Sequence, residues 1–166
     1  MNQKPNQNKQ LTHLNKRDEA HMVDVSDKPI TKRFATASAI LQTRPDVITM
    51  IADGNIPKGD VAAVARIAGI MAVKKTSTLI PLCHPIPIEA VEIGIELRES
   101  SIHIRCTVTN SAKTGIEMEA LTGVSVAALA VYDMCKAVDR AMSIEHIQLE
   151  EKSGGNSGHF IRNKIS

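Results

Sequence analysis

The hydrophobic pattern has a period of two in the middle of the chain. Valine, isoleucine and leucine alternate with glutamate and glycine from Val91 to Leu97, and apolar residues again alternate with polar ones from Ile102 to Val108. This period is typical of half-buried strands. Because only residues 99–101 separate the two segments, we predict an antiparallel hairpin. Two further strands are predicted, over 31–39 and 144–150.

Two helices and a loop are predicted before the hairpin. A proline at the first position and a glycine after the last predict a short helix over 45–53. A second helix is predicted from the segment after Asp60 to Lys75, because an acid stands at its start and bases at its end. Three prolines within 77–89 remove backbone donors and predict a stiff, extended loop there.

The longest predicted helix covers 113–140, where residues three or four positions apart share a face. One arc is apolar, and we expect it to pack against the chain's own sheet: Val124, Ala127, Ala128, Val131, Met134, Cys135 and Val138. The opposite stripe is mixed: Thr122, Val126, Leu129, Asp133, Lys136 and Arg140. Because Val126 and Leu129 lie among its polar members, we predict that a second protein surface or a cleft covers part of this stripe.

The order of these elements is strand, helices, two strands, helix, strand. It predicts an α+β, ferredoxin-like fold, in which helices pack on one face of an antiparallel sheet and the other face is available to a partner. Residues 1–20 are rich in asparagine, glutamine and lysine and predict a flexible N-terminal arm. We predict one domain over 21–166, with a glycine-rich C-terminal loop at 152–160.

Composition narrows the functional classes. A net charge of +2 is too mild to indicate a nucleic-acid or membrane surface, and an aromatic content of 2% leaves little for base stacking. Three cysteines without a CxxC pair predict a reducing compartment and no zinc site. No apolar run resembles a signal peptide or approaches the length of a membrane span. We therefore expect a cytoplasmic protein that binds neither nucleic acid nor membrane.

Three candidate residues lie outside the long helix, each with a plainer alternative. His84 follows Cys83 in the stiff proline loop, where its ring could titrate near neutral pH or simply face solvent. Lys58 stands beside a glycine just before a helix, a position suited to a phosphate or to a solvated lysine. Lys152 precedes a glycine run that does not fit a Walker loop, yet it could reach an anion.

The long helix carries acids at its start and an acid–base pair near its end. Glu117 fits a capping box with Thr114, whereas Glu119 fits either the helix dipole or a catalytic acid. Asp133 and Lys136 are three residues apart, so they form either an exposed ion pair or, if covered, a tuned proton donor or acceptor. The mixed stripe favours the functional interpretation of this pair.

Six segments together resemble one known family: HMVDVS at 21–26, KGDVAAVARIAGI at 58–70, LIPLCHP at 79–85, TGIEMEAL at 114–121, VYDMCKAVD at 131–139 and KSGGNSG at 152–158. From about Leu11 to Phe160 the chain resembles the cyclic pyranopterin monophosphate synthases, molybdenum cofactor biosynthesis protein C. The resemblance implies a ferredoxin-like fold, a hexamer of three dimers and active sites where subunits meet. It agrees with the mixed stripe around Asp133.

The resemblance also implies a reaction. The substrate would be 3′,8-cyclo-7,8-dihydroguanosine triphosphate, which a radical enzyme makes from GTP. The products would be cyclic pyranopterin monophosphate and pyrophosphate. Ring opening and reclosure need proton transfers, and a sugar hydroxyl must attack the α-phosphorus. No cofactor is implied, although Mg²⁺ could accompany the triphosphate.

Roles follow from the matching motif positions. Asp133 would be the principal acid or base, with Lys136 beside it, and Lys58 and Lys152 would meet the triphosphate or the reacting ring. The residues expected to line the substrate are Leu82, Cys83, His84, Met118 and Glu119. Glu117 and Asp24 match acidic positions. Asn156 stands where related sequences often carry a base, which would leave more to Lys152.

Two other functions fit the same strand order. One is a ferredoxin-like RNA-binding or regulatory module, although His103, Arg105 and Thr107 stand where stacking aromatics would be expected. The other is a hydrolase that acts directly on GTP. Turnover of GTP alone, compared with turnover of the cyclised intermediate, separates these possibilities.

Overall fold

The computed structural model describes residues 17, 19–156 and 158–163. Most of the predicted N-terminal arm lies outside the described residues, so its flexibility stays a prediction. The elements, in chain order, are β1 (Thr31–Gln42), α1 (Pro45–Ala52), α2 (Val61–Lys74), α3 (Thr76–Leu79), β2 (Ala90–Leu97), β3 (Ser101–Ala112), α4 (Glu117–Cys135), β4 (Ser143–Ser153) and β5 (Phe160–Ile161).

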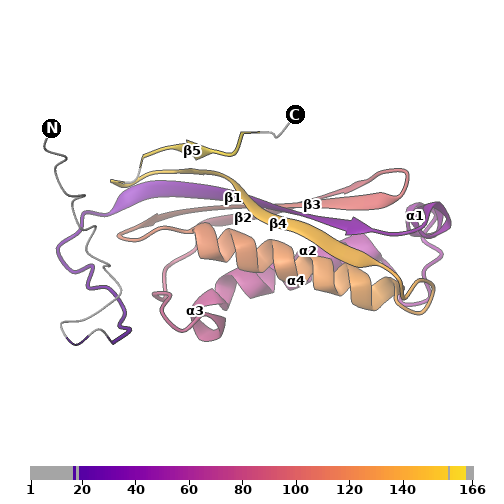
Figure 1. Ribbon diagram of the computed structural model, residues 1–166, viewed down its shortest axis with the longest axis horizontal. Helices are drawn as coiled ribbons and strands as arrows, with labels where there is room; N and C mark the ends of the chain where they lie inside the picture. Colours follow the sequence, from indigo (N-terminus) through magenta and orange to yellow (C-terminus); the bar gives the residue numbers. More distant parts are fainter. Residues whose placement is uncertain (1–16, 18, 157, 164–166) are drawn as a thin grey trace, which may run out of the picture.

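The strands form one antiparallel sheet in the order β2-β3-β1-β4-β5. Helices α2 and α4 lie side by side on one face of this sheet, and α1 lies beyond its far end (Figure 1). Without the short β5, the spatial order of the strands is that of a ferredoxin-like βαββαβ unit, so the predicted fold class is confirmed.

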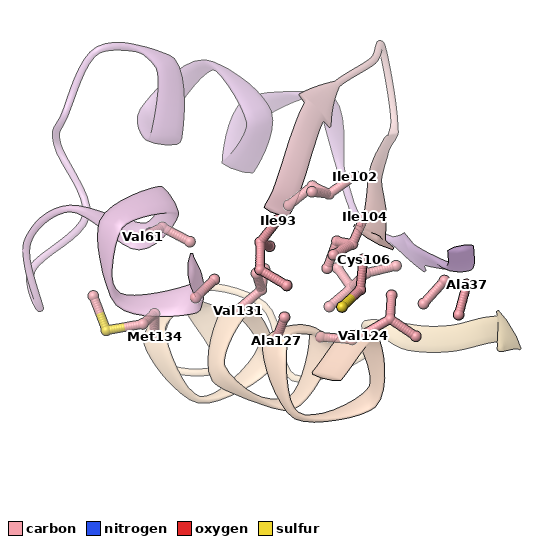
Figure 2. Close-up of a cluster of buried hydrophobic side chains, with 14 of the residues drawn as sticks. Ala37, Val61, Ile93, Ile102, Ile104, Cys106, Val124, Ala127, Val131 and Met134 are labelled. Atoms are coloured by element: carbon pink, nitrogen blue, oxygen red, sulfur yellow. The ribbon is translucent and has the colours of Figure 1, made fainter. Parts of the chain in front are cut away.

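The core lies between the sheet and its helices. Alternate residues of the two central strands point into it, including Ala37 of β1 and Ile104 and Cys106 of β3, which are almost completely buried. They meet the apolar arc of α4 (Figure 2). Helices α2 and α4 pack closely at Gly69 and Gly123, because a Cβ on Gly69 would lie only 3.1 Å from the Gly123 carbonyl oxygen and one on Gly123 only 2.6 Å from the Val73 side chain. A glycine is needed where the two backbones approach this closely.

The long helix is shorter than predicted at both ends, since α4 begins at Glu117 and ends at Cys135, with Lys136 as its C-cap. The predicted capping box is wrong, because the Thr114 hydroxyl donates to the Gly115 carbonyl and the N-cap residue, Ile116, makes no side-chain cap. The predicted buried arc is confirmed for all its members within α4, and Val138 is half-buried in the turn that follows.

The remaining expectations hold with changed boundaries. Both predicted helices, over 45–53 and from after Asp60 to Lys75, are present, and so are all four predicted strands. Strands β1, β3 and β4 each extend beyond their predicted ends. The extended loop is wrong for its first three residues, because α3 continues the chain from α2. The Thr76 hydroxyl donates to the carbonyls of Ala72 and Val73 there. The pairing of β5 with β4 was not predicted.

By length and composition alone, α4 could cross a membrane. Its apolar residues are instead buried against the sheet and α2, as expected for the core helix of a folded domain. We therefore treat α4 as a core helix.

Candidate active site

A pocket of about 480 Å³ opens at the N-terminal end of α4, beside the segment that leads into β1. Four parts of the chain line it: the segment before β1, the proline loop, the entrance of α4 and the C-terminal glycines. Sequence-predicted residues in its lining are Leu82, Cys83, His84, Glu117, Met118 and Glu119, together with Asn156. The fold therefore brings together the proline-loop and helix-entrance motifs, which are separated by the hairpin in the sequence.

The two glutamates in the pocket have opposite electrostatic environments. Burial is the largest single influence and raises the pKa of Glu117, but the Lys152 hydrogen bond, at 2.9 Å between Nζ and Oε1, the backbone amide of Glu117 and the charges of Lys152 and Arg33 together hold this pKa below its ordinary value. Glu119 is only 4% exposed, and its Oε2 accepts no hydrogen bond from any described residue. Burial and the charge of Glu117 raise its pKa. The pocket thus holds one paired carboxylate and one carboxyl that is inclined to keep a proton.

His84 is oriented by the segment before β1. Its Nε2 lies 2.8 Å from the Val23 carbonyl oxygen, and because a carbonyl can only accept, Nε2 must carry the hydrogen. Nδ1 is thereby left free of that contact and can act as an acceptor when the ring is neutral. The neighbouring Cys83 thiol has its pKa raised by burial and by the charge of Glu119, so it is a poor nucleophile or metal ligand.

Asp24 shapes the same segment and is not part of the pocket lining. Its carboxylate accepts hydrogen bonds from the Ser26 amide at 2.8 Å and the Ser26 hydroxyl, and these lower its pKa. Lys113 Nζ donates to the Ser26 carbonyl at 2.6 Å. Asp24 therefore builds a turn that positions Val23 over His84.

The structure adds basic residues that the sequence reasoning missed, namely Lys28, Arg33 and Lys113 in the pocket lining. Arg33 donates from Nε to the Ala112 carbonyl at 3.1 Å and from Nη2 to the Lys113 carbonyl. Its guanidinium also lies against Gly155, where a Cβ would come within 2.4 Å of Nη1. No local motif marks Arg33. Arg33 follows Lys32 in a strand that also carries threonine and serine, so the sequence did not distinguish it.

Asp133 is at the other end of α4 and holds two lysines. Lys136 Nζ lies 2.7 Å from Oδ1, and Lys58 Nζ lies 2.6 Å from Oδ2 and 2.9 Å from the Asp133 carbonyl oxygen. These hydrogen bonds, with that from Lys136 the larger influence, lower the pKa of Asp133 to about 2. We call these three residues the aspartate cluster. Within one chain its side chains are about half exposed, so water screens the ion pairs strongly.

The predicted site is therefore divided between the two ends of one helix. Glu117 and Asp133 are sixteen residues apart on α4, or about 24 Å at the helical rise. No single small molecule can touch the pocket and the aspartate cluster of the same chain. Among the described residues, no group of three or more histidines, cysteines, aspartates and glutamates could hold a metal ion.

The fold and site together define an α+β enzyme domain whose acidic and basic groups suit a small anionic substrate. The family model of the MoaC family matches residues 22–155. The chain belongs to the MoaC family.

Similar proteins agree with this assignment. The chain is 58% identical over 153 residues to cyclic pyranopterin monophosphate synthase 3 of Mycobacterium tuberculosis and of Mycobacterium bovis, which covers 92% of this chain and 86% of each relative. It is 56% identical over 153 residues to cyclic pyranopterin monophosphate synthase 1 of Mycobacterium tuberculosis, covering 92% of this chain and 90% of the relative.

Proposed function

We propose that this protein is an enzyme of molybdenum cofactor biosynthesis that forms cyclic pyranopterin monophosphate and releases pyrophosphate. The observation that carries the proposal is the 58% identity, over 92% of the chain, to proteins named for this product. The substrate is 3′,8-cyclo-7,8-dihydroguanosine triphosphate, supplied by a radical enzyme that cyclises GTP. The relatives support neither an RNA-binding or regulatory module nor a hydrolase of GTP.

The charges of the site suit both halves of this reaction. Ring opening and reclosure need groups that give and take protons, and Glu119 and His84 both line the pocket where they could do so. Closure of the cyclic phosphate joins a sugar oxygen to the α-phosphorus, breaks the bond to the bridging oxygen and releases pyrophosphate, while the hydroxyl proton passes to a base. Lys58, Lys136 and Lys152 would stabilise the negative charge that develops.

Asp133 has a narrower role than a general acid. With its pKa lowered to about 2, its carboxylate is ionised at neutral pH and cannot donate a proton. We propose that it accepts a proton or holds the two lysines toward the substrate. Leu82, Cys83 and Met118 would contact the base-derived rings, and Mg²⁺ could accompany the triphosphate as part of the substrate.

We further propose that two chains share each active site, within a cytoplasmic hexamer of three dimers. The pocket of one chain would meet the aspartate cluster of another, because the two ends of α4 are too far apart to act on one molecule. A sharing arrangement also covers the mixed stripe of α4. A fully active monomer would contradict it.

The reaction is tested by incubating the enzyme with GTP and, separately, with the cyclised triphosphate. We expect pyrophosphate and cyclic pyranopterin monophosphate in equal amounts from the cyclised triphosphate and no turnover of GTP. Turnover of GTP alone would overturn the proposal.

Sharing is tested by subunit exchange between Asp133→Asn and Glu119→Gln, each of which should be inactive alone. Each mixed pair holds one intact site, so random exchange should restore about a quarter of wild-type specific activity. The matched control mixes Asp133→Asn with Lys136→Met. These changes lie in the same cluster, so every site stays damaged and activity should not return. Equal outcomes in both mixtures would contradict a shared site.

A further inference from the structure

Gly115 stands in the short link between β3 and α4 and lines the pocket. Its φ lies outside the left-handed region, unlike the φ values of Gly54 and Gly158. A residue with a side chain could therefore adopt the same backbone without strain. The backbone conformation does not explain why a glycine stands here.

The space that a side chain would need at this position is taken by Glu117. A Cβ on Gly115 would overlap Glu117 Oε2, and it would lie 2.9 Å from Cδ and 3.0 Å from Oε1 of the same side chain. The Glu117 carboxylate thus folds back over Gly115. On β2, by contrast, a Cβ on Gly94 would meet only the Arg105 Cβ, at an ordinary contact distance of 3.9 Å.

The folded-back carboxylate is held from two sides. It accepts a hydrogen bond from its own backbone amide, and Lys152 Nζ lies 2.9 Å from Oε1. Lys152 is opposite the buried Ala35 in the pairing of β1 with β4, which places it on the helix-covered side of the sheet. The side chains of Lys152 and Glu117 are only 21% and 27% exposed, so water screens this ion pair less than it screens the aspartate cluster.

We propose that Gly115 is a positioning residue, because its missing side chain leaves the space in which Glu117 folds back and holds Lys152 beside the pocket. The inference deepens the proposed function and rests on it for the role of Lys152. An alanine at this position would displace the carboxylate, since the far end of a flexible side chain moves more easily than the backbone. Lys152 would then lose the contact with Glu117 that helps to fix the direction of its ammonium group.

The displacement is tested in the full chain with Gly115→Ala. Lys152 and the other groups around Glu117 hold its pKa below the ordinary 4.5, so we expect this pKa to rise toward 4.5 in the variant. Carbon-detected NMR titration of the Glu117 carboxyl group measures the change. The melting temperature should stay close to that of wild type, because the backbone accepts an alanine. An unchanged Glu117 pKa would overturn the inference.

A double-mutant cycle separates displacement of Glu117 from direct obstruction of the pocket by the new methyl group. We expect Gly115→Ala to lower kcat/KM for the cyclised triphosphate about tenfold. In a Glu117→Ala background the same change should cause no further loss, because no carboxylate remains to be displaced. A further loss of the same size would show that the methyl group blocks the substrate itself, and it would overturn the inference while the proposed function stands. Wild-type turnover in Gly115→Ala would also overturn it.

The matched control is Gly94→Ala, at another glycine whose φ lies outside the left-handed region and where a Cβ has room. It should change neither kcat/KM nor the pKa of Glu117, and an equal loss in both alanine variants would contradict the role of Gly115. The titration needs no substrate, so it separates this inference from the proposed function. A raised Glu117 pKa in Gly115→Ala, together with a wild-type enzyme that turns over no cyclised triphosphate, would support the displacement and count against the proposed function.

Discussion

The two ends of α4 use ionisable residues in opposite ways. At the entrance, Glu117 and Glu119 are mostly buried, and burial raises both pKa values. For Glu117, Lys152, the Glu117 backbone amide and the charge of Arg33 together reverse this effect. At the exit, Asp133 is exposed, and two lysines lower its pKa to about 2. Burial therefore prepares one end to hold a proton, while direct pairing keeps the other end charged. An enzyme that needs both states has to bring the two ends together.

Among these substitutions, replacing Asp133 by asparagine should have the largest effect on turnover. The exchange removes the carboxylate that pairs with both lysines, so we expect kcat/KM to fall by about a hundredfold or more. The circular dichroism spectrum should not change, because the side chain is 55% exposed. Asp46→Asn, at an exposed acid paired with Arg44, serves as the control and should keep full turnover. Wild-type turnover in Asp133→Asn would reject the role of this residue.

Removing one lysine at a time from the aspartate cluster should partly reverse the lowering of the Asp133 pKa. Lys136→Met and Lys58→Met should each raise the pKa of Asp133 from about 2 toward its ordinary value of 3.8, with the larger change for Lys136. Carbon-detected NMR titration of the Asp133 carboxyl group measures this directly. We expect kcat/KM to fall by about tenfold to a hundredfold in each variant. An unchanged pKa in both variants would show that the lysines do not act through Asp133.

Replacing Glu119 by glutamine should reveal, in the melting temperature, the cost of burying an ionised carboxylate at the entrance of α4. Burial raises the pKa of Glu119 in the folded chain, so its stabilising contribution is complete below the unfolded value of about 4.5 and is lost as pH rises through the raised value. Glutamine imitates the protonated acid and avoids that loss. At pH 7 we expect the variant to melt about 2–4 °C higher than wild type while losing turnover, and the difference should shrink near pH 4. A lower melting temperature at pH 7 would contradict the assigned burial cost.

The smallest expected effect concerns the glycine loop beside the pocket. Gly155 and Gly158 have nearly equal φ values, 71° and 69°, but only a Cβ on Gly155 would meet the Arg33 guanidinium. Both alanine variants carry the same backbone strain, so their difference isolates the Arg33 contact. We expect Gly155→Ala to raise KM by about two- to fivefold over Gly158→Ala, with kcat little changed. Equal KM values would remove Arg33 from substrate positioning.

Prediction from the sequence worked best where a repeating pattern was long. The β2–β3 hairpin and the buried arc of α4 followed from periods of two and of three to four residues, because burial on one face forces that spacing. It failed at the entrance of α4, where Thr114 looked like a cap. Arg33 and Lys113 hold that segment through contacts with parts of the chain about 80 residues away, which no local pattern reveals.

The sequence by itself determined the strand and helix order, the apolar arc of α4 and the motifs shared with the MoaC family, because these depend on local spacing and residue type. Only the tertiary structure decided which motifs meet. It joined the proline loop, the entrance of α4 and Arg33 in one pocket, and it placed Lys58 on Asp133 at the opposite end of the helix. A rigid helix keeps those two groups apart by its length, a separation that follows from geometry and not from residue identity.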